Sequence, residues 1–144
     1  MTTRFRSQTL AAMAAALLLA ACAGIGGGAG MGYGLKLSGD QEVPPVSTAA
    51  SGTGTIRVAA DGSVSGSVTT TGLNGTAAHI HIGAMGKNGP VIVPLAKTAD
   101  GVWSVAPGAK LTADQLKAYQ AGELYVNVHT DANKGGELRA QLKP

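Results

Sequence analysis

The sequence predicts an all-β fold, an antiparallel Greek-key β-sandwich of about eight short strands with one short helix. Three observations support this fold class. From residue 35 onward the chain is rich in Val, Thr, Gly and Ala, and polar and apolar residues alternate over short runs. Turn signals recur about every ten residues, as they do between short antiparallel strands. Strands do not alternate with long helical segments, so we do not expect the parallel sheet of an α/β protein.

The first hairpin has the clearest local signal. Residues 55–58 and 64–70 alternate, and the Asp61-Gly62 dipeptide between them is typical of a tight hairpin turn. The next turn is expected at residues 73–75, where the sequence is Leu-Asn-Gly. The remaining strands are expected at residues 77–83, 91–97, 102–106, 123–130 and 137–142.

One short helix is expected at residues 112–120. Thr112 is a typical N-cap, and Gln115 three residues later completes a capping box. Gly122 is well placed to end the helix. A helix of two to three turns is not stable alone, so we expect it to pack against the sheets.

The N-terminal region has the composition of an export signal. Arg4 and Arg6 precede an apolar run at residues 10–21, which at about a dozen residues is too short to span a membrane. Residues 19–22, Leu-Ala-Ala-Cys, resemble the bacterial lipobox. We therefore expect cleavage before Cys22 and acylation of that cysteine.

The domain organisation follows from this signal. We expect a lipoprotein signal peptide at residues 1–21, the acylated cysteine with a glycine-rich tether at residues 22–34, and one β-sandwich domain at residues 35–144. The membrane is then a partner through the lipid anchor. Ala23 after Cys22 is similar to the sorting pattern of outer-membrane lipoproteins, so we expect the domain at the periplasmic side of that membrane. The single cysteine leaves the domain without an internal disulfide.

Composition argues against two classes of function. The chain has 11 Lys and Arg against 8 Asp and Glu, and removal of Arg4 and Arg6 with the signal leaves 9 against 8. A nearly neutral domain without a basic run has no electrostatic footprint for nucleic acid. The sequence also has neither a Gly-x-Ser-x-Gly elbow nor a His-Glu-x-x-His helix. We therefore expect a binding protein rather than an enzyme.

All three histidines fall in two of the expected strands. His79 and His81 flank Ile80 in one strand, and His129 lies near the end of another. Side chains alternate along a strand, so His79 and His81 share a face, which points outward or into a cleft if Ile80 faces the core. Two imidazoles about 7 Å apart at Cα can bind one metal ion, and a third would complete the site. Copper is the expected metal and zinc the second choice.

Alternative interpretations of these side chains stay open. The histidines could be structural, with His79 bonded to a carbonyl and His129 anchoring a turn through Asp131. Met85, four residues after His81, could add a soft ligand that favours Cu(I). Met85 could equally be a loop side chain that covers the core.

Five segments of the chain form a recognisable set. They are residues 37–46 (LSGDQEVPPV), 78–83 (AHIHIG), 89–91 (GPV), 125–130 (YVNVHT) and 136–139 (GELR). In this order they resemble the CHRD (chordin-type) domain, over residues 35–142. The resemblance implies a β-rich extracellular domain, and it informs fold and location more than activity. This chain has one copy and none of the cysteine-rich modules of the animal growth-factor antagonist, so growth-factor binding is not implied.

Three functions remain open from the sequence. The first is an envelope-tethered metal-binding protein with copper at His79, His81 and His129. The second is a non-catalytic interaction or scaffold module without metal, whose protein partner is unknown. The third is an enzyme similar to a copper-only superoxide dismutase, which shares an exported β-sandwich with a His-x-His strand. The copper-zinc enzyme uses more histidines than this chain has, and in addition an aspartate for zinc and a disulfide.

Overall fold

The computed structural model of the chain describes residues 33–144. The expected signal peptide, Cys22 and the tether up to residue 32 lie outside the described residues. Eight strands form one antiparallel sheet in the order β1-β2-β3-β6-β5-β4-β7-β8. A short 3₁₀ helix, η1 (Gly39–Gln41), follows the first strand, and one α-helix, α1 (Ala113–Gln120), precedes β7. The strands are β1 (Gly34–Leu37), β2 (Ser51–Val58), β3 (Val64–Thr71), β4 (Ala77–Ile82), β5 (Val91–Ala99), β6 (Val102–Val105), β7 (Leu124–His129) and β8 (Leu138–Gln141).

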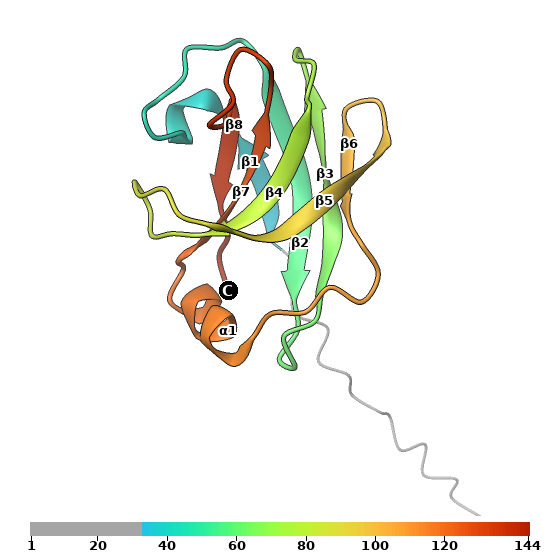
Figure 1. Cartoon of the computed structure of the whole chain (residues 1–144), viewed down its shortest axis with the longest axis vertical. Coiled ribbons are helices and arrows are strands. Elements are labelled where there is room, and N and C mark those ends of the chain that lie inside the picture. The colour runs from blue at the N-terminus through green and yellow to red at the C-terminus, as the bar shows by residue number, and fades with distance from the viewer. Residues whose placement is uncertain (1–32) are drawn as a thin grey trace, which may run out of the picture.

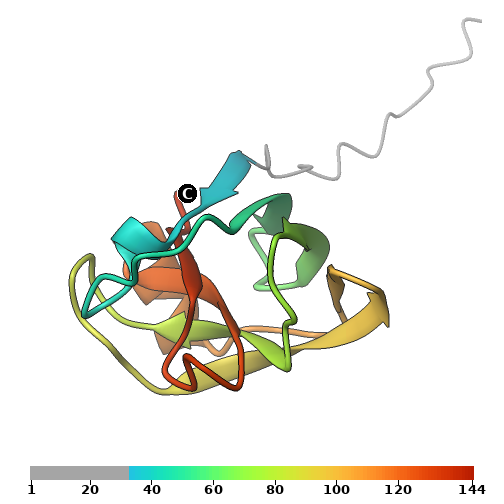
Figure 2. The ribbon, with the colours of Figure 1, turned by 90° about the horizontal axis from the view of Figure 1, so that it is seen from above.

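The sheet curls until its two edge strands meet (Figures 1 and 2). Ser38, directly after β1, exchanges two backbone hydrogen bonds of 3.1 Å with Arg139 of β8. The pairing of β3 with β6, and of β4 with β7, gives the crossovers of a Greek key. The predicted all-β class is confirmed, in the form of one nearly closed sheet whose two halves face each other across the core.

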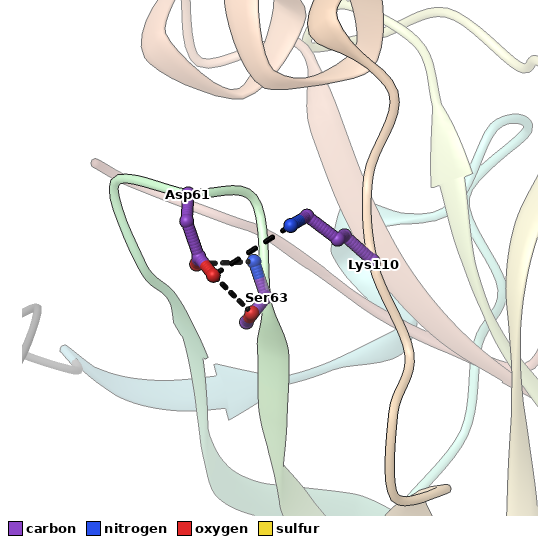
Figure 3. Close-up of polar contacts among 3 residues, drawn as sticks. All are labelled: Asp61, Ser63 and Lys110. Carbon is purple, nitrogen blue, oxygen red and sulfur yellow. Dashed lines mark hydrogen bonds and ion pairs between the residues drawn. The ribbon is translucent and has the colours of Figure 1, made fainter.

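The first hairpin forms where the sequence predicts it. β2 pairs with β3 over their whole length, from Ser51 opposite Thr71 to Val58 opposite Val64. Figure 3 shows how Asp61 fixes the turn. Its carboxylate accepts hydrogen bonds from the Ser63 backbone N–H (3.0 Å) and hydroxyl (2.8 Å), and these bonds lower the pKa of Asp61. A Lys110 ammonium 3.7 Å away adds an exposed ion pair.

The core fills the inside of the curled sheet, and α1 covers one open end (Figure 1). Apolar side chains alternate with polar ones along each strand, so that one face of the sheet packs inward. The fully buried members at 0% exposure are Val68, Ile80, Leu124, Val126, Val128 and Leu138. Because Ile80 faces the core, its two histidine neighbours point to the outer face, as the sequence predicts. Neither helix of the described residues has the length and hydropathy that crossing a bilayer requires.

The helix begins with the predicted capping box. The Thr112 hydroxyl accepts a hydrogen bond from the Gln115 backbone N–H (3.2 Å), and the Gln115 side chain accepts one from the Thr112 N–H (2.9 Å). Gly122, two residues after the helix, has a φ of +74°, which a side chain would oppose. The buried Tyr119 ring packs against the core and its hydroxyl donates to the Lys143 carbonyl at 3.0 Å.

Replacing the N-cap residue Thr112 should lower the free energy of unfolding of the domain. Thr112→Ala leaves the Gln115 N–H without its acceptor, so the free energy of unfolding should fall by about 1 kcal/mol. Thr112→Ser keeps an acceptor oxygen and should stay close to wild type. Urea unfolding of the three proteins measures both effects, and a Thr112→Ala protein as stable as wild type would contradict the role of the cap.

Candidate metal site

Three histidines from two adjacent strands converge on the outer face of the sheet. His79 and His81 lie in β4, and His129 is the last residue of β7. The pairing of these strands places Asn127 opposite His79 and Tyr125 opposite His81. The His79 Nδ1 lies 2.9 Å from the His129 Nε2, and one nitrogen from each ring lies within 4.8 Å of the others. The structure thus brings together the three side chains that the sequence singles out.

Two backbone carbonyls determine which nitrogen of each ring carries a proton. The His81 Nδ1 lies 2.8 Å from the Gly89 carbonyl oxygen, and the His129 Nδ1 lies 2.9 Å from that of Lys134. A carbonyl oxygen only accepts, so each Nδ1 donates a hydrogen. In the neutral rings the Nε2 atoms then carry the lone pairs. A metal-binding histidine characteristically donates its other nitrogen to such a partner.

The His81 ring has a buried nitrogen that lacks a partner in the described part of the chain. His81 is 7% exposed, and its Nε2 has no hydrogen-bond partner among residues 33–144. A buried acceptor without a partner costs roughly 1–3 kcal/mol. The His129 Nε2 does have a partner, because the His79 Nδ1–H can donate to it. The donor chemistry of all three rings therefore fits a metal ion.

Burial favours the neutral forms of His79 and His81 by lowering their pKa. Burial lowers the pKa of His79, and the nearby His129 and His81 lower it further. Burial also lowers the pKa of His81, and a hydrogen bond to the Gly89 carbonyl acts in the opposite direction. A neutral imidazole is the form that ligates a metal. The lowered pKa of His79 and of His81 is thus compatible with a metal site.

Tyr125 and Arg139 support His81 from the neighbouring strands. The His81 ring stacks on Tyr125 with centroids 4.8 Å apart and planes at 8°. The Arg139 guanidinium carbon lies 3.5 Å from the centroid of the Tyr125 ring, a cation–π contact. Arg139 is 1% exposed and binds the loop between β4 and β5 through the Ala84 carbonyl (3.3 Å), the Lys87 carbonyl (2.9 Å) and the Asn88 side chain (3.2 Å). The same loop supplies the carbonyl that orients His81.

The buried carboxyl of Glu42 belongs, with Tyr125, Asn127 and Arg139, to a polar layer around the three histidines. Glu42 is 4% exposed and follows η1 in a segment that runs beside the β4–β5 loop (Figure 2). The Asn88 side chain ties the two segments by donating to the Val43 carbonyl at 2.7 Å. Burial raises the pKa of Glu42 to about 7, although the Arg139 charge and hydrogen bonds from Val43 and Asn127 act against it.

Met85 lines a cavity that no histidine lines, and its role as an additional ligand stays a prediction. The side chain is 75% exposed on the β4–β5 loop. It borders a cavity of 380 Å³ together with Glu42, Pro45 and Arg139, and no histidine is among the described residues that line this cavity. The structure therefore gives no support to Met85 as an additional ligand.

The sequence did not single out most of the supporting residues. The sequence does offer Glu42 as a candidate partner of Arg139, of Lys87 or of a histidine. Tyr125 has no spacing that marks a site, and the carbonyls of Gly89 and Lys134 have no side-chain signal at all. One signal was present, because four of the five supporting residues fall in the segments that carry the family resemblance. Each of the five segments contributes at least one residue to the polar layer and the three histidines. In chain order these residues are Glu42; His79 and His81; Gly89; Tyr125, Asn127 and His129; and Gly136 and Arg139.

The raised pKa of Glu42 predicts a pH-dependent stability. The carboxyl titrates near 4.5 when unfolded and near 7 when folded, so between these values the folded state keeps a proton that the unfolded state has lost. Stability from this group therefore falls as the pH rises through this window. Glu42→Gln removes the titration, and its free energy of unfolding should rise relative to wild type by roughly 2 kcal/mol, after allowance for solvent screening.

The measurement is denaturant unfolding of wild type and Glu42→Gln at a series of pH values. The difference between the two proteins should grow from pH 4.5 to pH 7 and then level off. Taking the difference cancels the contributions of the titratable groups that both proteins share. A difference that stays constant across the window would show that this carboxyl ionises normally.

Comparison with known proteins places the chain in a family. The model of the CHRD domain matches residues 33–142, nearly the whole chain and all of the sheet. Neither the comparison with curated proteins nor that with solved structures found a match. The match covers the five segments that form the polar layer around the three histidines. The chain belongs to the CHRD domain family.

Proposed function

We propose that this protein binds a metal ion, with copper as its metal, through His79, His81 and His129. The observation that carries the proposal is the convergence of the three rings, with a nitrogen from each within 4.8 Å of the others. Imidazole nitrogens suit both copper and zinc, and a given nitrogen site binds Cu²⁺ more tightly than Zn²⁺. Copper therefore takes precedence over zinc in this proposal.

The three rings would take different roles in holding the ion. His81 and His129 would bind through Nε2, because their Nδ1 atoms donate to the Gly89 and Lys134 carbonyls. In the metal-free protein the His79 Nδ1–H faces the His129 Nε2 at 2.9 Å. Binding requires that proton to move to the other nitrogen of His79 or to leave, so that both lone pairs can face the ion.

The location belongs to the same proposal. The Arg4 and Arg6 segment, the apolar run and the lipobox at residues 19–22 support export and a lipid on Cys22. A domain held in this way would bind its metal at the cell envelope, on the periplasmic side of the outer membrane. The near neutrality of the exported part is consistent with a small-ion ligand rather than a highly charged polymer.

Metal titration of the purified protein tests the proposal. Wild type should bind one Cu(II) per chain. The His81→Ala/His129→Ala double variant should bind it more than about 100-fold more weakly, because losing two ligands exceeds the effect of losing an outer partner. Met85→Ala is the matched control and should keep the wild-type affinity, since Met85 does not lie with the histidines.

Circular dichroism of each variant in this titration checks that the fold is kept.

Two results would contradict the proposed metal binding. One is a wild-type protein that takes up no stoichiometric copper or zinc, which would favour the metal-free interaction module. The other is a double variant that binds copper as tightly as wild type.

A further inference from the structure

Asn127 contains another buried atom that lacks a hydrogen-bond partner among the described residues. Asn127 lies in β7 opposite His79 and two residues before His129, and it is 1% exposed. Its Oδ1 has no hydrogen-bond partner in the described part of the chain, and neither does the His81 Nε2. The Glu42 Oε1 also lacks a partner among these residues, and it lies on the Gly136 side of the Asn127 amide, close to the Nδ2. The His81 Nε2 and the Asn127 Oδ1 belong to residues that share the face of the sheet with the other two rings, so a common explanation is called for.

The surroundings of Asn127 set the direction of its carboxamide. The Nδ2 donates to the Gly135 carbonyl at 3.2 Å. The amide nitrogen therefore faces Gly135, and the Oδ1, at the other end of the planar carboxamide, points away from that carbonyl.

Gly136 helps to hold the carboxamide in this orientation. Its φ of +130° lies in the region that favours glycine. A Cβ at this position would overlap both the Glu42 Oε1 and the Asn127 Nδ2. Because Gly136 has no side chain, its backbone can lie close to the Asn127 Nδ2 and the Glu42 Oε1, and this contact restricts rotation of the carboxamide.

Both unsatisfied atoms are acceptors in the metal-free protein. With its Nδ1 donating to Gly89, neutral His81 presents an Nε2 lone pair, and the Asn127 Oδ1 presents lone pairs as well. Two acceptors cannot form a hydrogen bond with each other. A cation bound among the three rings would give both atoms a partner.

We propose that the Asn127 Oδ1 is the fourth ligand of the metal, an oxygen donor at the buried side of the three-histidine group. This assignment rests on the proposed function. A carboxamide oxygen is a harder ligand than imidazole and suits divalent ions better than Cu(I). Asn127 thereby makes the site selective for Cu(II) and Zn(II). His79 and His129, which are only half-buried, leave the ion an approach from solvent.

The test compares the affinities of the purified protein for Cu(II), Zn(II) and Cu(I). Asn127→Leu should bind Cu(II) and Zn(II) about tenfold or more weakly, while its Cu(I) affinity should change by less than about threefold, because Cu(I) does not depend on an oxygen ligand. Asn127→Asp keeps an oxygen donor and adds a charge, so its divalent affinity should match or exceed that of wild type. Gln120→Leu, which replaces an exposed amide at the end of α1 outside the polar layer, should leave all three affinities unchanged.

The Cu(II) electron paramagnetic resonance spectrum provides a second readout. Asn127→Leu should change the parallel hyperfine splitting, and Gln120→Leu should keep the wild-type spectrum. An Asn127→Leu protein with wild-type Cu(II) affinity and spectrum would overturn the assignment. Equal losses of Cu(I) and Cu(II) would also overturn it, because they indicate a structural role.

The two proposals fail in different ways. A wild-type protein without metal affinity contradicts the proposed function itself. Wild-type binding that Asn127 variants do not alter contradicts only the fourth ligand. If Asn127→Leu does not fold, Asn127→Asp decides, since a divalent affinity well below that of wild type would overturn the assignment.

Discussion

The antiparallel register of β4 with β7 is the constraint on which both the core and the candidate site depend. It places His79 opposite Asn127 and His81 opposite Tyr125, while Ile80 packs against the interior opposite Val126. Because side chains alternate with a period of two, a slip of one residue would move the rings into the core. The free energy gained by burying the apolar residues therefore also fixes the positions of the histidines.

The β4–β5 and β7–β8 loops orient the histidine rings, whose positions on the sheet the strand register determines. Carbonyls from the β4–β5 loop and the β7–β8 loop orient His81 and His129, and the buried Arg139 holds the first of these loops through hydrogen bonds to Ala84 and Lys87. Arg139 also closes the sheet through its backbone pairing with Ser38. Closure of the sheet, loop position and ring orientation are thus connected through one residue, so that a well-defined site forms on a small domain.

The sequence predicts the scaffold better than the surroundings of the site. Alternation and turn chemistry locate the hairpin at Asp61-Gly62 and the helix cap at Thr112, because these signals are local. The pairing of β4 with β7 joins residues about fifty positions apart, and no local pattern determines it. The grouping of the histidines was inferred from composition, whereas the tautomers depend on the carbonyls of Gly89 and Lys134, which any residue could supply. Cys22 and the signal peptide stay predictions, because they lie outside the described residues.

The most direct test of the account is the protonation state of the two oriented rings. Nitrogen-15 NMR of imidazole-labelled, metal-free protein at mildly alkaline pH distinguishes the tautomers of His81 and His129. We expect a proton on Nδ1 and none on Nε2 in both rings. Added Zn(II) should then shift both Nε2 resonances while the Nδ1 protons stay. Rings protonated at Nε2 in the metal-free protein, or Nε2 resonances that do not respond to metal, would contradict the central claim.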